Sequence, residues 1–211
     1  MAHILLIHGA WHDGSCWDKT AAILRKAGHD VACPDLPIHP GTTLADCVAA
    51  LPVIPPPLVV AHSMGGMIAE AMTRPVKALV HLCSYLPLAG DSLSRLDRLL
   101  PAPSRNWPRD EQGRLILPDG QARQMMYHDS PAERLPPLRP QPTGPMRERL
   151  TVRRDVMRHY ILCENDRAIP PALQRAMVAR ATVDHLYSRP WGHSPFLSDP
   201  AGLAQLIDSL T

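Results

Sequence analysis

Short apolar runs of strand length, rich in valine, isoleucine or leucine, recur along the chain. They cover residues 4–7, 31–33, 58–61, 77–83, 160–163 and 185–187. Near-continuous apolar runs are typical of parallel strands that helices cover on both faces. The pattern therefore predicts a mainly parallel sheet at the centre of the molecule.

Helical stretches alternate with these runs, and several of them place apolar residues three and four positions apart. The expected helices cover residues 17–27, 43–51, 65–73, 171–181 and 200–210. Thr42 or Thr43 and Asp199 are suitable N-cap residues, and proline suits the first turn of the last two helices. Strands that alternate with helices are joined by right-handed crossovers, so we expect a doubly wound α/β fold.

Residues 87–156 depart from this alternation. Prolines and arginines crowd there, and no strand-like apolar run is longer than residues 115–117. The segment nevertheless keeps a tryptophan, a tyrosine and paired methionines, which a free linker would not need. We expect a single domain, with residues 1–86 and 157–211 as the α/β core and residues 87–156 as an inserted lid of short helices and turns.

The composition excludes some functions. The 211 residues carry a net charge of +2, so there is no sign of binding to nucleic acid or to an anionic membrane surface. The five cysteines lack CxxC spacing, which favours reduced thiols over disulfides or a metal site. No apolar run approaches the roughly 18 residues that cross a bilayer, and the amino terminus lacks a basic leader. We expect a soluble, cytoplasmic protein.

A serine stands where a predicted strand meets a predicted helix, in LVVAHSMGGMIAEAM. At such a junction, the nucleophile elbow, the chain turns so sharply that the residues two before and two after the serine must be small. Ala61 and Gly65 hold these positions, so the general pattern GxSxG is present here as AxSxG. Such strings also arise by chance, but the strand before and the helix after Ser63 make it the expected nucleophile.

Two backbone N–H groups are the expected donors to the oxyanion of a tetrahedral intermediate. The N–H of Met64 begins the helix after Ser63 and faces the place where the oxyanion would form. The second donor is the N–H of Ala10 in HGAW, directly after the first strand. Gly9 lets this loop approach the elbow closely.

Histidine has an ordinary pKa of about 6.5, which suits a general base, and the chain has 11 histidines. His193 is the expected base because it follows the last predicted strand, at the edge of the sheet where Ser63 also emerges. His62 adjoins the nucleophile but points away from it at a sharp turn, so we expect it in the pocket wall or in a structural role. Three further histidines that could face the pocket are His12, His81 and His128.

The acid that orients the base should follow another strand. YILCENDRAIP begins with the fifth predicted strand, residues 160–163, and offers Glu164 and Asp166 just after it. We expect Asp166, which lies deeper in the turn and leaves room for one helix and one strand before His193. A buried carboxylate there would hold the imidazole tautomer and stabilise the imidazolium. The alternative is that Asp166 only caps the helix that begins near Pro170.

Several motifs together resemble one branch of the α/β-hydrolase superfamily. They are HGAWHDGSCW, GHDVACPDLP, AHSMGG, YILCENDRAIP and GHSPFLSDP, with YHDSP and RPQP in the lid segment. The branch contains plant methylesterases, hydroxynitrile lyases and small bacterial esterases. The resemblance implies an α/β-hydrolase fold with the helical lid inserted after the sixth-strand region. It also implies Ser63, Asp166 and His193 as the triad, with Ala10 and Met64 as oxyanion donors.

At two positions this chain differs from the hydroxynitrile lyases of the branch. In the lyases a threonine follows the first-strand histidine and a lysine follows the catalytic histidine. Gly9 and Ser194 stand at these places here, which argues against cyanohydrin cleavage. The lid is also shorter than in the plant enzymes, so no substrate is carried over.

We therefore expect an esterase that cleaves a small or medium carboxylic ester through an acyl-enzyme on Ser63, without metal or cofactor. The small-molecule ester is the expected partner, and a homodimer is an option that the sequence leaves open. The alternatives are lactone or thioester hydrolysis, a lyase-type reaction at the same site, and a non-catalytic ligand-binding homologue. The expected walls of a mostly apolar pocket are Trp11, His62, Tyr85 and Tyr127.

Overall fold

The structure is a computed structural model, which describes residues 1–101, 106–131 and 135–211. Its centre is a six-stranded sheet in the order β2-β1-β3-β4-β5-β6, and every neighbouring pair is parallel. The strands are β1 His3–Ile7, β2 Asp30–Ala32, β3 Leu58–His62, β4 Ala78–Leu82, β5 Arg158–Cys163 and β6 His185–Arg189. The predicted fold class is confirmed, and each predicted strand is present within two residues at either end.

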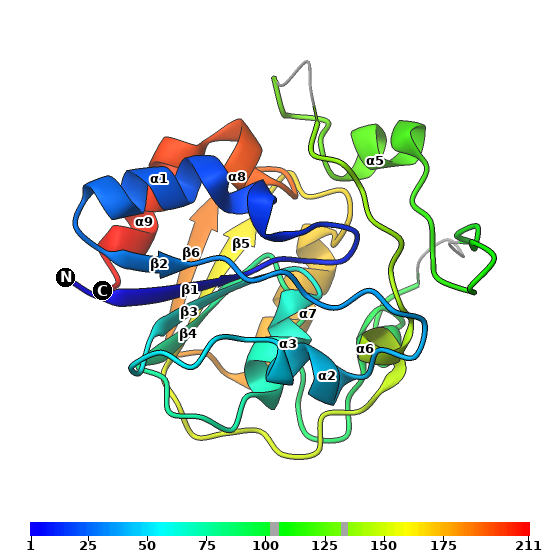
Figure 1. Ribbon diagram of the computed structural model, residues 1–211, viewed down its shortest axis with the longest axis horizontal. Coiled ribbons are helices and arrows are strands. Elements are labelled where there is room, and N and C mark those ends of the chain that lie inside the picture. Colours follow the sequence, from blue (N-terminus) through cyan, green and yellow to red (C-terminus); the bar gives the residue numbers. More distant parts are fainter. Residues whose placement is uncertain (102–105, 132–134) are drawn as a thin grey trace.

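Helices cover both faces of this sheet (Figure 1). One face carries α1 Asp18–Lys26, α8 Pro195–Ser198 and α9 Pro200–Asp208, and the other carries α2 Leu44–Ala49, α3 Gly65–Ala71 and α7 Pro171–Ala181. Alternate residues of a strand point to opposite faces. In β1, Ile4 and Leu6 therefore pack under α1 and α9, whereas Leu5 and Ile7 pack under α3. Burial on both sides explains why the central residues of β1 and β3 are apolar.

Helix starts follow the predicted N-caps. The Thr43 side chain accepts from the backbone N–H of Asp46, and the Asp46 carboxylate accepts from the N–H of Thr43, so the two form a capping box. Asp199 caps α9 by accepting from the N–H of Gly202. The predicted helix before β4 ends two residues early, because Met72 has an extended backbone. The short helices η1 Gly14–Trp17 and α8 were not predicted.

The segment that we predicted as a lid joins β4 to β5, the fourth and fifth strands of the sheet. Its described residues form α4 Leu93–Leu96, α5 Asp119–Met125 and α6 Gly144–Arg147. Leu115 makes isolated antiparallel bridges to Arg109 and Gln141, so the apolar run there forms no regular strand. Figure 1 shows α5 on the side of the molecule opposite the two termini. The bounds 87 and 156 of the lid remain a prediction.

No helix in the described ranges is both long enough and apolar enough to cross a membrane.

Candidate active site

The site lies where the sheet order reverses direction. The chain runs from β1 to β2 on one side and then crosses back to β3 on the other, so the loops after β1 and β3 separate and leave a crevice at the carboxyl ends of the strands. Ala10 lies in the first of these loops and Ser63 directly follows β3. The topology thus brings together two sequence motifs that are more than 50 residues apart.

Ser63 occupies a strained turn between β3 and α3. Its φ is +54°, in the left-handed region that non-glycine residues rarely adopt. The turn is held from β4, because Ser63 N–H donates to Leu82 O at 3.3 Å and Tyr85 N–H donates to Ser63 O at 3.0 Å. Glycine is required after it, since a Cβ on Gly65 would lie 2.9 Å from Ile7 O and a Cβ on Gly66 would lie 2.1 Å from Tyr85 O. The local structure is that of a nucleophile elbow.

His193 and Asp166 are hydrogen-bonded to each other in the core. His193 lies in the loop between β6 and α8, and its Nδ1 is 2.8 Å from Asp166 Oδ2. Both side chains are buried. Since Asp166 occupies Nδ1, the ring nitrogen that remains for Ser63 is Nε2. Ser63 and His193 both line one cavity.

The Asp166 carboxylate is also fixed by its own loop and by α7. Oδ1 accepts from the N–H groups of Ala168 at 2.7 Å and Ile169 at 2.9 Å, and Oδ2 accepts from Gln174 Nε2 at 3.2 Å. These bonds stabilise an ionised carboxylate in a buried position. The competing residue Glu164 is instead paired with Arg175 on the surface, at 2.7 Å. The geometry therefore distinguishes the two acids that the sequence offered.

The expected oxyanion donors both line the cavity that contains Ser63. Within the described parts of the chain, neither the Ala10 N–H nor the Met64 N–H donates to a protein acceptor. Gly9 makes the approach possible, because a Cβ there would lie 2.8 Å from Ser63 Cβ. Two N–H groups without protein partners beside Ser63 are what an oxyanion requires.

The histidines around His193 are neutral and lie outside the cavity. His62 is fully buried, and its Nε2 donates to His193 O at 2.8 Å. Burial lowers the pKa of His62 well below its ordinary value, and the charge of His193 lowers it further. Burial also lowers the pKa of His8 to about 4 and that of His12 to about 3.

Two of the four predicted pocket residues are in the cavity wall and two are not. Trp11 and Tyr85 line the cavity. His62 lies behind His193, with ring centroids 4.6 Å apart. Tyr127 turns away, and its hydroxyl bonds His12 Nε2 at 2.7 Å, because a buried hydroxyl needs a partner. Neither His81 nor His128, which the sequence left open, lines the cavity.

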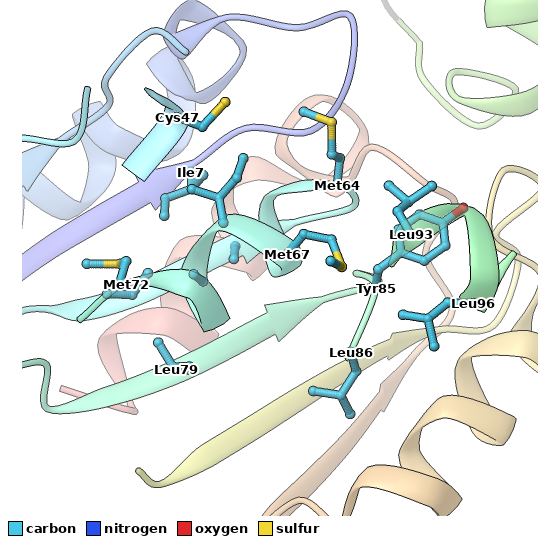
Figure 2. Close-up of a cluster of buried hydrophobic side chains, with 14 of the residues drawn as sticks. Ile7, Cys47, Met64, Met67, Met72, Leu79, Tyr85, Leu86, Leu93 and Leu96 are labelled. Carbon is cyan, nitrogen blue, oxygen red and sulfur yellow. The ribbon is translucent and has the colours of Figure 1, made fainter. Parts of the chain in front are cut away.

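The cavity has a volume of about 370 Å³. Its apolar walls include side chains that sequence reasoning did not assign, namely Met64, Leu93, Trp107, Met125, Met126, Met146 and Ile169. Figure 2 shows Met64, Tyr85 and Leu93 in the buried cluster that continues below into Met67. The wall is more polar than expected, since it also includes Asp97, Arg98, Arg109 and Arg147. Most of these residues come from the insertion, where no periodic pattern indicates which side chains turn inward.

Among the described residues, one group has metal-ligand geometry: His62, Cys83 and His193, whose ligand atoms lie within 4.8 Å of one another. These groups have partners at one atom each, while His62 Nδ1 has none among the described residues. His62 Nε2 and Cys83 Sγ both donate to His193 O, at 2.8 and 3.5 Å, and His193 Nδ1 is bonded to Asp166. The donors fit a hydrogen-bonded protein core, and we assign no metal to them.

This fold and this arrangement of side chains define an α/β-hydrolase. The chain belongs to the alpha/beta hydrolase family, whose model matches residues 4–206. It is 26% identical to Methylesterase 18 of Arabidopsis thaliana over 97% of this chain and 95% of that protein. It is 35% identical to the carbendazim hydrolyzing esterase of a Nocardioides species, and this match spans 46% of the chain and 47% of that protein.

Comparison with solved structures also identifies an α/β-hydrolase. The pyrethroid hydrolase of Sphingobium faniae matches with a TM-score of 0.82 and 26% identity, over 99% of this chain and 96% of that one. These comparisons confirm the resemblance to the methylesterase branch of the α/β-hydrolases. They also confirm the expected class of enzyme, a hydrolase of the esterase group.

Proposed function

We propose that this protein hydrolyses a small or medium carboxylic ester through an acyl-enzyme on Ser63. The observation that carries the proposal is the convergence of four strand ends on one cavity. They bring the strained Ser63, the hydrogen-bonded His193 and Asp166, and the two N–H groups of Ala10 and Met64 to the same place.

The reaction follows from these positions. Nε2 of His193 takes the Ser63 proton while Oγ attacks the ester carbonyl, and Asp166 stabilises the imidazolium. The N–H groups of Ala10 and Met64 stabilise the oxyanion of the tetrahedral intermediate. Its collapse breaks the ester C–O bond, and His193 returns the proton to the leaving alcohol. Water, deprotonated by His193, then attacks the acyl-enzyme and releases the acid.

The apolar part of the cavity wall supports an ester with an apolar acyl group. A volume of about 370 Å³ lies in the lower part of the range of small-molecule sites, and methionine, tryptophan and isoleucine form the apolar part of a wall that also carries Asp97 and three arginines. Methionine side chains adapt to substrates of different shape. The names of the relatives, methylesterase and pyrethroid hydrolase, agree with hydrolysis of small esters.

Gly9 argues against a lyase reaction at the same site. Where the lyases carry threonine, a side chain here would place its Cβ 2.8 Å from Ser63 Cβ and 2.9 Å from His62 Nδ1. No side chain larger than hydrogen fits this position without a backbone shift. The loop is shaped to bring its N–H close to Ser63, which serves acyl transfer.

The test is a series of p-nitrophenyl esters of increasing chain length, with Ser63→Ala as the variant. We expect turnover of short and medium esters and a loss of at least about a thousandfold in Ser63→Ala. Ser94→Ala is the matched control, because Ser94 lines the same cavity but donates to Met146 O. A fluorophosphonate should label the wild-type protein and the control but not Ser63→Ala. Unlabelled wild-type protein, or Ser63→Ala that still turns over esters, would contradict the proposal.

A further inference from the structure

Two lid motifs, YHDSP and RPQP, contact the loops that carry the catalytic groups. The first contributes Asp129 and the second contributes Gln141. Asp129 binds the loop of His193, and Gln141 binds the loop of Ala10. Neither residue lines the cavity, so neither touches the substrate there.

Asp129 fits against the residue that precedes the base. Its Oδ2 accepts from the backbone N–H of Gly192 at 2.6 Å. The fit depends on glycine, because a Cβ on Gly192 would lie 2.5–2.7 Å from the carboxyl atoms of Asp129. The Gly-His dipeptide is therefore explained by the lid, which occupies the space that a side chain would need.

The remaining supports of His193 come from the core. Asp166 holds its ring nitrogen Nδ1, and His62 Nε2 holds its carbonyl. Among the described residues of the inserted segment, Asp129 joins this set, and it binds the backbone one residue before His193. Without it the backbone on the lid side of the base loses a charge-assisted bond.

Gln141 acts on the opposite loop in the same way. Its Oε1 accepts from the N–H of Trp11 at 3.2 Å, and its Nε2 donates to Pro142 O at 2.9 Å, which fixes the amide. The N–H of Arg139 donates to Trp11 O at 2.8 Å. Trp11 needs this support because its φ is +64°. Since Trp11 directly follows Ala10, holding Trp11 also holds the Ala10 peptide.

We propose that Asp129 and Gln141 are positioning residues of the esterase site, which rests on the function proposed above. Asp129 sets the position of His193 relative to Ser63, and Gln141 sets the position of the Ala10 N–H. The lid therefore completes the catalytic geometry in addition to forming walls of the pocket.

The test measures kcat per active site, counted by titration with a fluorophosphonate, together with KM and Tm. Asp129→Ala and Gln141→Leu should lower kcat about 10- to 100-fold, because small displacements of catalytic groups have large effects on rate. KM should stay within about threefold in Asp129→Ala, since Asp129 bonds Gly192 outside the described cavity wall. In Gln141→Leu it should change less than kcat, because the wall residue Trp11 keeps its bond to Arg139 N–H. A role in stability alone would lower Tm and the number of active sites but leave kcat per site unchanged.

Two further variants separate the hydrogen bond from general damage. Asp129→Asn keeps an oxygen that can accept from Gly192 N–H, so it should restore kcat to within about threefold of the wild type. Asp119→Ala is the matched control, because Asp119 is an exposed lid aspartate at the start of α5. Gly192→Ala should reproduce the kcat loss of Asp129→Ala, and it serves as the probe if that variant does not fold.

Wild-type kcat per site in Asp129→Ala and Gln141→Leu would overturn the proposal, and so would an equal loss in Asp119→Ala. If Asp129→Asn is as slow as Asp129→Ala, the bond to Gly192 is not what Asp129 supplies. Failure of the proposed function would be seen separately, because the wild-type protein itself would then not be labelled and would not cleave esters.

Discussion

Gly9→Ala tests how closely the loop of Gly9 and Ala10, which carries one of the proposed oxyanion donors, must approach the turn at Ser63. The added Cβ would lie 2.8 Å from Ser63 Cβ. Carbon atoms in contact are about 3.5–4.0 Å apart, so one of the two segments must move by roughly 0.7–1.2 Å. The same Cβ would lie 2.9 Å from His62 Nδ1, which leaves the loop little freedom to rotate instead.

Two consequences can be measured in Gly9→Ala. A displacement of about 1 Å between Ser63 and the Ala10 N–H should lower kcat about 100-fold. Overpacking in a buried site should destabilise the fold by about 1–3 kcal/mol. For a chain of this length that lowers Tm by about 2–12 °C. The assays are ester turnover per titrated site and thermal unfolding followed by circular dichroism.

Gly120→Ala is the control for Gly9→Ala. A Cβ at Gly120 meets no atom within 4 Å, and the residue lies in α5, where alanine is the better helix former. Its kcat should equal that of the wild type, and its Tm should not fall. The reasoning would be refuted if Gly9→Ala kept wild-type kcat, because the loop would then not need its close approach.

Two other predictions concern Asp166 and His8. Asp166→Asn should lower kcat by roughly four orders of magnitude with KM nearly unchanged, because the amide favours the wrong tautomer of His193; a loss below tenfold in ester turnover would show that Asp166 does not orient the base. Because burial holds the pKa of His8 at about 4 in the folded state, below its ordinary 6.5, the unfolded chain binds more protons in this range. The contribution of His8 to the free energy of unfolding should therefore be fully present above pH 6.5, and it should fall by about 3 kcal/mol as the pH drops to 4. The free energy of unfolding, measured with urea across this pH range, should fall less in His8→Gln than in the wild type. An equal dependence on pH in the two proteins would contradict the lowered pKa of His8.

The sheet could be predicted because its physical cause is local. Strands such as β1 and β3 are buried on both faces, so most of their residues are apolar in a continuous run that is visible in the sequence. The short helices η1 and α8 could not be predicted, since four residues show no period. The cap of α2 was predicted as Thr42 or Thr43, and Thr43 is the N-cap.

The residues of the candidate site were predictable where a serine, histidine or aspartate follows a predicted strand. Ser63, Asp166 and His193 each follow a strand, and parallel topology brings these ends together. Tyr127 was placed wrongly because its partner, His12, is 115 residues away and the sequence contains no sign of the pair. The sequence predicted that His62 points away from Ser63. It could not predict the bond of His62 to the His193 carbonyl, because that bond depends on tertiary packing.

The supports of the site differ between the core and the lid. Among the described residues, the printed bonds to the Ser63 backbone come from Leu82, the last residue of β4, and from Tyr85, and those to the Asp166 carboxylate come from the core as well. The loops of His193 and Ala10 need the lid as well, through Asp129 and Gln141. The same inserted segment contributes Met125 and Met146 to the cavity wall. Substitutions of Met125 and Met146 should therefore change substrate preference and substitutions of Asp129 and Gln141 should change catalytic rate, whereas substitutions around the turn at Ser63 should change rate and stability.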